Sequence, residues 1–195
     1  MERSGKLHAV VIPVKAFGQA KERLAGVLRA DQRRHLAQVL ATRVVLAAAP
    51  LPVFVVCDDD EVATWATSLG ATVAWTPALG LNAAVRTAVG SLATSGIDVV
   101  TVAHGDLAEP STLGSLPVID GVTLVPDTRR DGTNVIVVQT ALPFEFGYGP
   151  GSFERHRREC ARLGVAHLVV ESILGRDVDV PSDLDQLDRS ALGLG

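Results

Sequence analysis

The stretch PVFVVCDDDEVATWATSLGATVAWT, residues 52–76, decides the fold, because it combines two apolar runs with a helical pattern between them. The two runs, residues 52–57 and 71–76, are short and rich in valine, which is typical of buried strands. The intervening residues EVATWATSLG, 61–70, have a helical pattern that ends at a glycine. Strands joined through a helical crossover run parallel, so this stretch predicts one unit of a parallel sheet.

The same alternation continues in both directions along the chain. Upstream, HAVVIPV at residues 8–14 predicts a strand, and ADQRRHLAQVLATRVVLAAA at residues 30–49 predicts a helix. Downstream, LNAAVRTAVGSLATSG at residues 81–96 predicts a helix, and IDVVTVAHGD at residues 97–106 predicts a strand. Strands alternating with helices form a mostly parallel sheet with helices on both faces. The sequence therefore predicts an α/β fold.

The remainder of the chain is less regular. Three further strands are expected at residues 121–127, 134–140 and 166–172, with a helix at residues 152–164 between the last two. This part leaves room for an antiparallel strand at the edge of the sheet. No internal repeat or linker is present, so we expect one domain over residues 1–195.

The composition is that of an ordinary globular protein and argues against several classes of partner. Apolar residues make up 47% and charged residues 21% of the 195 residues. The net charge of −4 disfavours nucleic acid and anionic membrane as partners, since both bind surfaces with a basic excess. The most apolar run, residues 44–56, is broken by Pro50 and Pro52, so no membrane-spanning helix is expected. The apolar stretch at the N-terminus is also too short for a secretory signal.

The cysteines and histidines form no metal-ligand pattern. Cys57 and Cys160 lie far apart in the sequence and lack the spacing of a zinc site. A disulfide framework and a cysteine zinc site are therefore excluded as organising features. Free thiols are typical of a reducing compartment, so we expect a cytoplasmic protein. The histidines are expected to be incidental.

A polar loop after the first predicted strand carries three cations, Lys15, Lys21 and Arg23. In an open α/β sheet, ligands bind outside the carboxyl ends of the strands, where lysines can hold a polyphosphate. We expect Lys15 and Lys21 to be exposed on this loop. The loop lacks the GxxxxGK[ST] pattern of a Walker A motif. The alternative interpretation is three solvated surface cations beside the start of a helix.

Three aspartates follow or approach strand ends. Asp106 ends the fourth predicted strand, and Asp177 and Asp179 are two residues apart, so an extended backbone would place both carboxylates on one face. Together the three would form an oxygen-rich site that suits Mg²⁺ better than zinc. The alternatives are a helix cap at Asp106 and an ordinary polar turn at the other two.

Two turns carry groups that suit an anion. Gly149 and Ser152 lie in a glycine-rich turn that enters a predicted helix, whose free backbone N–H groups attract negative charge. Thr133 lies in the turn DGTN, residues 131–134, which opens a strand. The alternative for the second turn is a simple hairpin connection.

Five motifs in order resemble one enzyme family, the 2-phospho-L-lactate guanylyltransferases, which include the phosphoenolpyruvate guanylyltransferases of coenzyme F420 biosynthesis. The motifs are VIPVKAFGQAKERLAGVL (11–28), GLNAAV (80–85), LVPDTRRDGTNVIVV (124–138), FGYGPGSFERHRREC (146–160) and RDVDVPSDLDQL (176–187). The resemblance implies a single-domain nucleotidyltransferase fold, related to the molybdopterin-nucleotide and nucleotide-diphospho-sugar transferases. One departure is the run DLAEP at residues 106–110, where the family usually shows DLP.

The resemblance also implies roles for the candidate residues. GTP would be the co-substrate and Mg²⁺ the cofactor, and the metal ligands would be Asp106, Asp177 and Asp179. The small phosphorylated acid would be held by Thr133, Gly149 and Ser152. The nucleotide would be held by Lys15, Lys21, Arg23 and Asn82, with Asn82 the best candidate for a base or ribose contact. The expected catalytic residues are Lys15, Lys21 and Asp106.

The implied reaction needs no general base, because a phosphate monoester is already anionic near neutral pH when it attacks the α-phosphorus of GTP. Metal and lysines would neutralise charge as pyrophosphate leaves. The acceptor is left open among phosphoenolpyruvate, 2-phospho-L-lactate and 3-phosphoglycerate. A downstream transferase would accept the labile product, and an oligomer is compatible with the sequence. Two alternatives remain: a transferase of the same fold acting on a sugar phosphate or molybdopterin, and an inactive nucleotide-binding protein.

Overall fold

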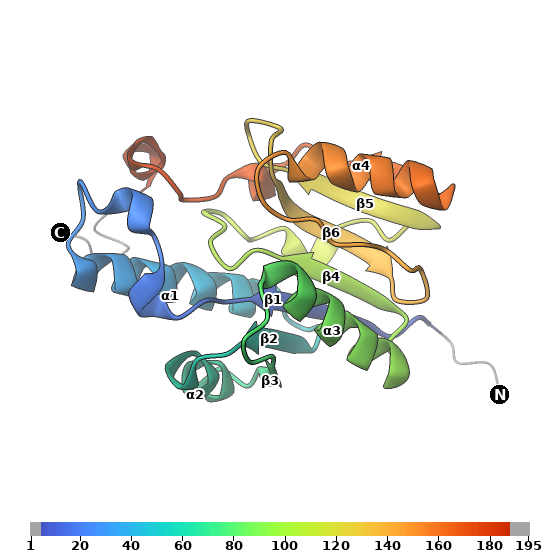
Figure 1. Cartoon of the computed structure of the whole chain (residues 1–195), viewed down its shortest axis with the longest axis horizontal. Coiled ribbons are helices and arrows are strands. Elements are labelled where there is room, and N and C mark those ends of the chain that lie inside the picture. The colour runs from blue at the N-terminus through green and yellow to red at the C-terminus, as the bar shows by residue number, and fades with distance from the viewer. Residues whose placement is uncertain (1–4, 188–195) are drawn as a thin grey trace.

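Valine-rich apolar segments form the seven strands of one sheet in the computed structural model, which describes residues 5–187. The order across the sheet is β3-β2-β1-β4-β6-β5-β7 (Figure 1). The strands are β1 (His8–Pro13), β2 (Val53–Cys57), β3 (Thr72–Trp75), β4 (Val99–Ala103), β5 (Gly121–Pro126), β6 (Thr133–Gln139) and β7 (Ala166–Val169). The predicted α/β fold with a mostly parallel sheet is confirmed, since only β6 runs against its neighbours.

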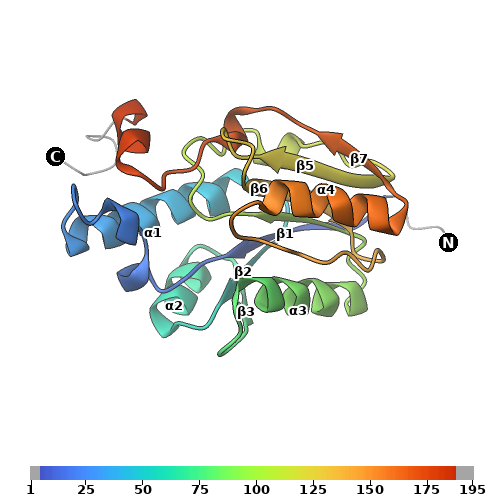
Figure 2. The ribbon, with the colours of Figure 1, turned by 45° about the horizontal axis from the view of Figure 1, so that its top comes forward.

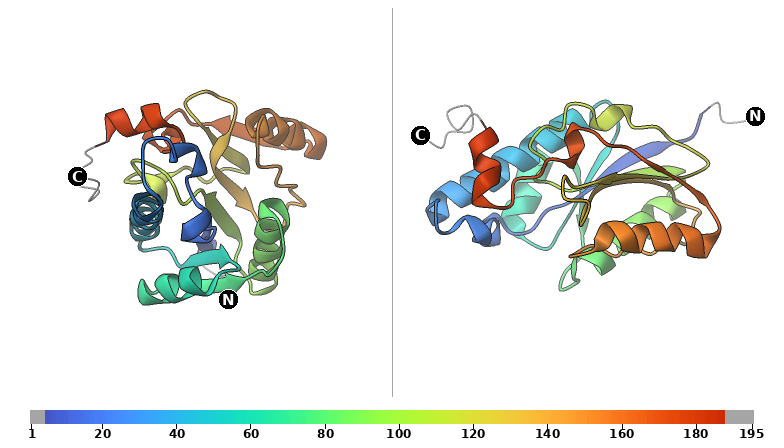
Figure 3. Two further views of the ribbon diagram at one scale, coloured as in Figure 1. Left: turned by 60° about the vertical axis from the view of Figure 1, so that its left-hand side comes forward. Right: turned by 90° about the horizontal axis from the view of Figure 1, so that it is seen from above.

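Helices cover both faces of the sheet, as predicted. They are α1 (Ala30–Ala47), α2 (Asp60–Ser68), α3 (Leu81–Thr94) and α4 (Ser152–Leu163). The apolar sides of α1 and α2 pack into one core on one face, and those of α3 and α4 pack into a second core on the other. Figures 2 and 3 show α3 and α4 together on the side of the sheet away from α1.

The antiparallel strand lies inside the sheet, so the prediction of an antiparallel edge is wrong. β6 pairs antiparallel with β4 and with β5, whereas the edge strand β7 pairs parallel with β5. The cause is the short turn between β5 and β6, which can connect only antiparallel neighbours. The segment after β6 then returns the chain to the end of the sheet where β6 began, because the N–H groups of Gly151 and Phe153 both donate to Asp131 there. From that end α4 leads to β7, which therefore runs opposite to β6 and parallel with β5.

The strand order creates a crevice beside β1. The chain proceeds from β1 to β2 and β3 on one side, and then returns to place β4 on the other side of β1. In open α/β sheets such a change of direction leaves a ligand site at the carboxyl ends of the two flanking strands. The loops that follow β1 and β4 therefore meet where a ligand is expected.

The C-terminal part of the chain returns to this crevice. Leu107 and Asp177 form an isolated antiparallel bridge, and the Ala108 N–H donates to the Arg176 carbonyl at 2.8 Å. Leu107 is fully buried. The DLAEP run thus follows a defined path that brings Asp177 to the end of β4. No helix within residues 5–187 is both long and apolar enough to cross a membrane.

Candidate functional site

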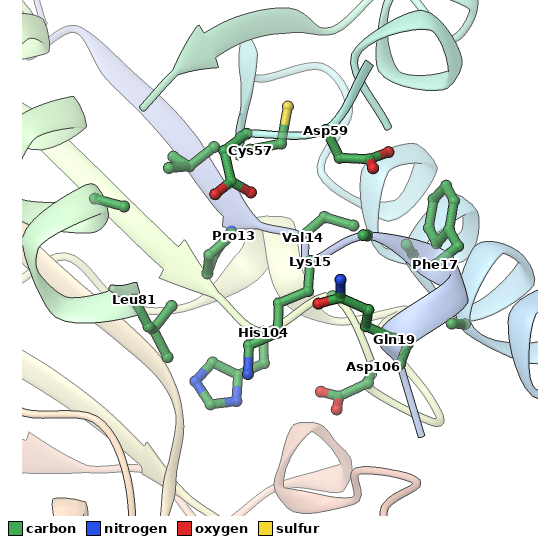
Figure 4. Close-up of a pocket in the computed structure, with 18 of the residues that line it drawn as sticks. Pro13, Val14, Lys15, Phe17, Gln19, Cys57, Asp59, Leu81, His104 and Asp106 are labelled. Carbon is green, nitrogen blue, oxygen red and sulfur yellow. The ribbon is translucent and has the colours of Figure 1, made fainter. Parts of the chain in front are cut away.

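A cavity of about 850 Å³ lies at the carboxyl end of the sheet, which is ample for a nucleotide. Its walls come from the loop after β1, the ends of β2 and β4, the start of α3, and Asp179. Figure 4 shows Lys15, His104 and Asp106 extending into this space from the β1 loop and the end of β4. The structure therefore brings the cationic loop and two of the three predicted metal ligands to one cavity.

The two lysines of the loop have different environments. Lys15 is exposed and forms no ion pair within the part of the chain that the structure describes. Lys21 is buried, with 6% of its side chain exposed, and its Nζ donates to Asp106 Oδ2 at 2.6 Å. The expectation that both are exposed is wrong for Lys21. Its backbone is left-handed, with φ of 59°, a conformation that costs energy for a residue with a side chain and is concentrated at functional sites.

The third cation of the loop is also bound to a carboxylate. Arg23 forms an ion pair with Asp179, although most of its side chain is exposed. The two ion pairs bind the loop to the segment after β4 that carries Asp106 and to the C-terminal segment that carries Asp179. As a result, two of the three cations predicted to hold phosphate and two of the predicted metal ligands neutralise one another.

Asp106 and Asp177 lie close enough to perturb each other. Burial raises the pKa of Asp177 to about 6, and the charge of Asp106 adds to this effect. Burial also opposes ionisation of Asp106, but the Lys21 ammonium, together with His104 and the hydrogen bonds to the carboxylate, outweighs burial and holds the pKa of Asp106 below its usual value. The second oxygen of Asp106, Oδ1, is buried without a hydrogen-bond partner among the described residues.

The acidic residues fit a divalent cation by their chemistry. Within residues 5–187, no three carboxylate, imidazole or thiol groups are already arranged as a metal site. However, the free oxygen of Asp106 and the repulsion between Asp106 and Asp177 would both be relieved by a hard cation between them. The cavity is also lined by five acidic and three basic side chains, so a triphosphate there needs further positive charge. These are Glu22, Asp58, Asp59, Asp106 and Asp179 against Lys15, Lys21 and Arg23.

Asn82 has a protein partner rather than an open position. Its Oδ1 accepts a hydrogen bond from the Tyr148 N–H at 2.7 Å, and its Nδ2 donates to the Tyr148 carbonyl at 3.4 Å. It lies on the first turn of α3 but does not line the cavity. The structure therefore assigns Asn82 to holding the glycine-rich segment, and a contact with the nucleotide stays a prediction.

The three predicted acceptor residues lie together at the start of α4. The Thr133 N–H donates to Ser152 Oγ at 3.0 Å, and the Ser152 N–H donates to the Gly149 carbonyl at 3.0 Å. Gly149 has a φ of 114°, which a residue with a side chain rarely adopts. Thr133 and Ser152 are buried, and none of the three lines the large cavity. Their role toward an acceptor stays a prediction.

Sequence reasoning missed His156, which was expected to be incidental. Its ring is fully buried and hydrogen-bonds to the Thr133 hydroxyl at 2.9 Å and to the Gly147 N–H at 2.9 Å. The available signal was its position four residues after Ser152, which puts both side chains on one face of the helix. Arg155 was also missed, and it donates to the carbonyls of Gly147, Gly149 and Pro150.

Solved structures with a similar arrangement of elements include a nucleotidyl transferase and a 4-diphosphocytidyl-2C-methyl-D-erythritol synthase. A nucleotidyl transferase from Methanothermobacter thermautotroptrophicus superposes with a TM-score of 0.68 at 16% identity, covering 98% of this chain and 100% of that chain. A 4-diphosphocytidyl-2C-methyl-D-erythritol synthase superposes with a TM-score of 0.60 at 15% identity, covering 98% and 99%. At these identities the likeness establishes the fold alone, and it confirms the predicted nucleotidyltransferase fold.

Sequence relatives are more specific. A phosphoenolpyruvate guanylyltransferase from Thermobaculum terrenum is 34% identical, over 94% of this chain and 83% of the relative. A protein of the same name from Salinispora arenicola is 35% identical, over 94% and 89%. The family described as "Guanylyl transferase CofC like" matches residues 8–188. The fold, the cavity and these matches agree, and the chain belongs to the guanylyl transferase CofC-like family.

Proposed function

We propose that this guanylyl transferase transfers GMP from GTP to a phosphorylated three-carbon acid, phosphoenolpyruvate or 2-phospho-L-lactate, and releases pyrophosphate. The observation that carries the proposal is the meeting of Lys15, Lys21 and Asp106 in one cavity at the crevice between β1 and β4. The names of the relatives favour phosphoenolpyruvate as the acceptor. We place the reaction in coenzyme F420 biosynthesis, as the family resemblance implies.

The cavity supplies positioning and charge, which are what phosphoryl chemistry of this kind requires. A phosphate oxygen of the acceptor attacks the α-phosphorus of GTP, and pyrophosphate departs on the opposite side. The attacking oxygen is already anionic, so no side chain has to remove a proton. Lys15 lies free to bind phosphate oxygens, and Lys21 can join it by exchanging Asp106 for a phosphate.

Mg²⁺ is the proposed cofactor, and Asp106, Asp177 and Asp179 are the residues that would hold it. When bound, it would neutralise part of the charge on the triphosphate and on the leaving pyrophosphate. Asp106 contributes a buried oxygen that has no hydrogen-bond partner within residues 5–187, and Asp177 would be held ionised by the added positive charge. Lys21 and Arg23 would be displaced from Asp106 and Asp179 at the same time.

The acceptor is proposed to bind at the start of α4. Thr133, Gly149 and Ser152 supply hydroxyl and backbone groups at a helix N-terminus, where the helix dipole favours an anion. Hydrogen bonds with Asn82 and Arg155 hold the backbone of this turn in place. A small acid fits this short turn better than a sugar phosphate or molybdopterin does.

The test is a pyrophosphate-release assay of the purified chain with Mg²⁺. GTP or ATP is combined in turn with phosphoenolpyruvate, 2-phospho-L-lactate or 3-phosphoglycerate, and with a sugar phosphate and molybdopterin as the alternative acceptors. A downstream transferase is included to capture a labile product. We expect GTP to be preferred over ATP by about tenfold or more. Equal turnover with ATP would refute the guanine preference. Turnover only with a sugar phosphate or molybdopterin would refute the acceptor, and no turnover with any acceptor would favour an inactive nucleotide-binding protein.

A further inference from the structure

The buried ring of His156 joins two segments that are distant in sequence and that both belong to the proposed acceptor site. On one side, Nδ1 hydrogen-bonds with the hydroxyl of Thr133, the first residue of β6. On the other side, Nε2 accepts from the N–H of Gly147 in the glycine-rich segment. The ring is fully buried, so no water competes for either contact. His156 thereby fixes the two segments relative to each other.

The contact with Gly147 determines which ring nitrogen carries the proton. A backbone N–H is always a donor, so Nε2 has to be the acceptor in that bond. In a neutral imidazole the other nitrogen then carries the hydrogen, and Nδ1 donates to Thr133 Oγ1. The oxygen of Thr133 is therefore used as an acceptor. Its own hydrogen has no acceptor among the residues that the structure describes.

We infer that His156 is a positioning residue that keeps the Thr133 hydroxyl as a hydrogen-bond donor toward the anionic acceptor. The inference rests on the proposed function, because it takes the start of α4 as the acceptor site. An anionic phosphate or carboxylate offers only acceptor atoms, so a hydroxyl serves it only when its hydrogen is free. His156 meets this requirement by occupying the oxygen of Thr133 with an N–H.

The surroundings keep the ring neutral, as this role requires. Burial, with the nearby positive charge of Arg155, lowers the pKa of His156 to about 4, and the smaller effect of His104 has the same sign. Glu159 acts in the opposite direction but is itself paired with Arg162. A protonated ring would lose the bond from Gly147, because Nε2 would then be a donor. The ring also does not line the large cavity, so it is not placed to exchange protons with the nucleotide.

Two substitutions separate the two nitrogens of the ring. In His156→Asn, the amide nitrogen falls near the position of Nδ1, because both atoms are two bonds from Cβ, and the bond to Thr133 is kept. In His156→Gln, the amide group reaches the position of Nε2, so a carbonyl can still accept from Gly147 but the donor to Thr133 is lost. Both variants lose one buried hydrogen bond and the packing of the ring against Phe144 and Tyr148, so the stability of each is measured beside its kinetics.

The experiment measures initial rates with GTP and phosphoenolpyruvate for the wild type, both variants and Thr133→Val. We expect His156→Gln and Thr133→Val each to raise the KM for phosphoenolpyruvate about tenfold, with the KM for GTP within about twofold. His156→Asn should keep the KM for phosphoenolpyruvate within about threefold of wild type. Adding Thr133→Val to His156→Gln should raise this KM little further, because one residue acts through the other.

Equal effects of the Asn and Gln variants on the KM for phosphoenolpyruvate would overturn the inference, since a purely structural ring would not distinguish them. The ¹⁵N chemical shifts of His156 give a readout that is independent of activity. We expect these shifts to report a neutral ring that is protonated at Nδ1. If the enzyme is active and the ring is protonated at Nε2, the inference is overturned. If the wild type transfers no GMP to any of the three acids, the proposed function fails first, and the inference fails with it.

Discussion

Lys21→Met removes the ammonium group that faces Asp106 and keeps most of the length of the side chain. In the wild type, Lys21 Nζ lies 2.6 Å from Asp106 Oδ2, and the side chains are 6% and 30% exposed. After the substitution, Oδ1 of Asp106 stays buried with no partner among the described residues, and Oδ2 loses the partner it had. We therefore expect the variant to be less stable at pH 7, because a carboxylate then stays desolvated without compensation.

The magnitude follows from the burial of the pair. Breaking a fully buried ion pair costs about 3–5 kcal/mol, and the partial exposure of Asp106 reduces this to about 2–3 kcal/mol. For a domain of this size, that corresponds to a fall in Tm of about 4–12 °C. The pKa of Asp106 is held below its usual value, so the pair stabilises fully above pH 4 and less as the pH falls through the folded-state pKa. The difference between variant and wild type should therefore shrink in acid.

The assay is urea unfolding of both proteins from pH 7 down to pH 3 in metal-free buffer. Lys15→Met is the matched control, since Lys15 lies on the same loop, is exposed and forms no ion pair within residues 5–187; it should change stability by less than about 0.5 kcal/mol. Combining Lys21→Met with Asp106→Asn should restore part of the loss. A Lys21→Met variant as stable as wild type at pH 7, or a loss that is independent of pH, would refute the reasoning.

Three further substitutions test other parts of the site. Asp177→Asn should stabilise the metal-free protein by about 1–2 kcal/mol at pH 8 and by nothing at pH 4, because the raised pKa of Asp177 makes its ionisation unfavourable; urea unfolding at both values decides this. Asn82→Ala should cost about 1–2 kcal/mol and raise the KM for the acid more than that for GTP, and the opposite split would support a nucleotide contact. Ser152→Ala should raise the KM for the acid about tenfold and leave the KM for GTP within about twofold. A rise in the KM for GTP alone would indicate that this turn binds the nucleotide and not the acid.

The parallel half of the fold could be predicted from the sequence because each element there carries its own signal. Residues 53–57 and 72–75 are short apolar runs, and a periodic helix with a glycine stop lies between them. Strand direction in this half follows from the helical crossovers. In the second half, the position of β6 could not be predicted, because it depends on which strand edge is free when the chain arrives. That is a property of the whole sheet rather than of residues 133–139.

The charged residues of the candidate site could be predicted from the sequence, but the ion pairs and hydrogen bonds that they form could not. The position of Lys15 and Lys21 after a buried strand, and of Asp106 after another, follows from the rule that ligands bind at strand ends. The contact between Lys21 and Asp106 depends on the left-handed backbone of Lys21 in an irregular loop. A glycine would have indicated such a backbone in the sequence, but this position is a lysine. The role of Asn82 was missed for a similar reason, because its partner is the backbone of Tyr148 and a backbone group leaves no mark in the sequence.

The ion pairs have a direct consequence for the order in which ligands bind. Lys21 and Arg23 occupy carboxylate oxygens that the proposed Mg²⁺ would also need, so a cation alone has to compete with two ammonium or guanidinium groups. A bound triphosphate would offer Lys21 and Arg23 alternative anions, and Asp106 and Asp179 would then be available to hold the proposed Mg²⁺. By linkage, the nucleotide and the metal then strengthen each other's binding by the same factor. If both ligands bind here, the loop after β1 is the element that both would rearrange, because Lys21 and Arg23 pair with carboxylates in the free protein.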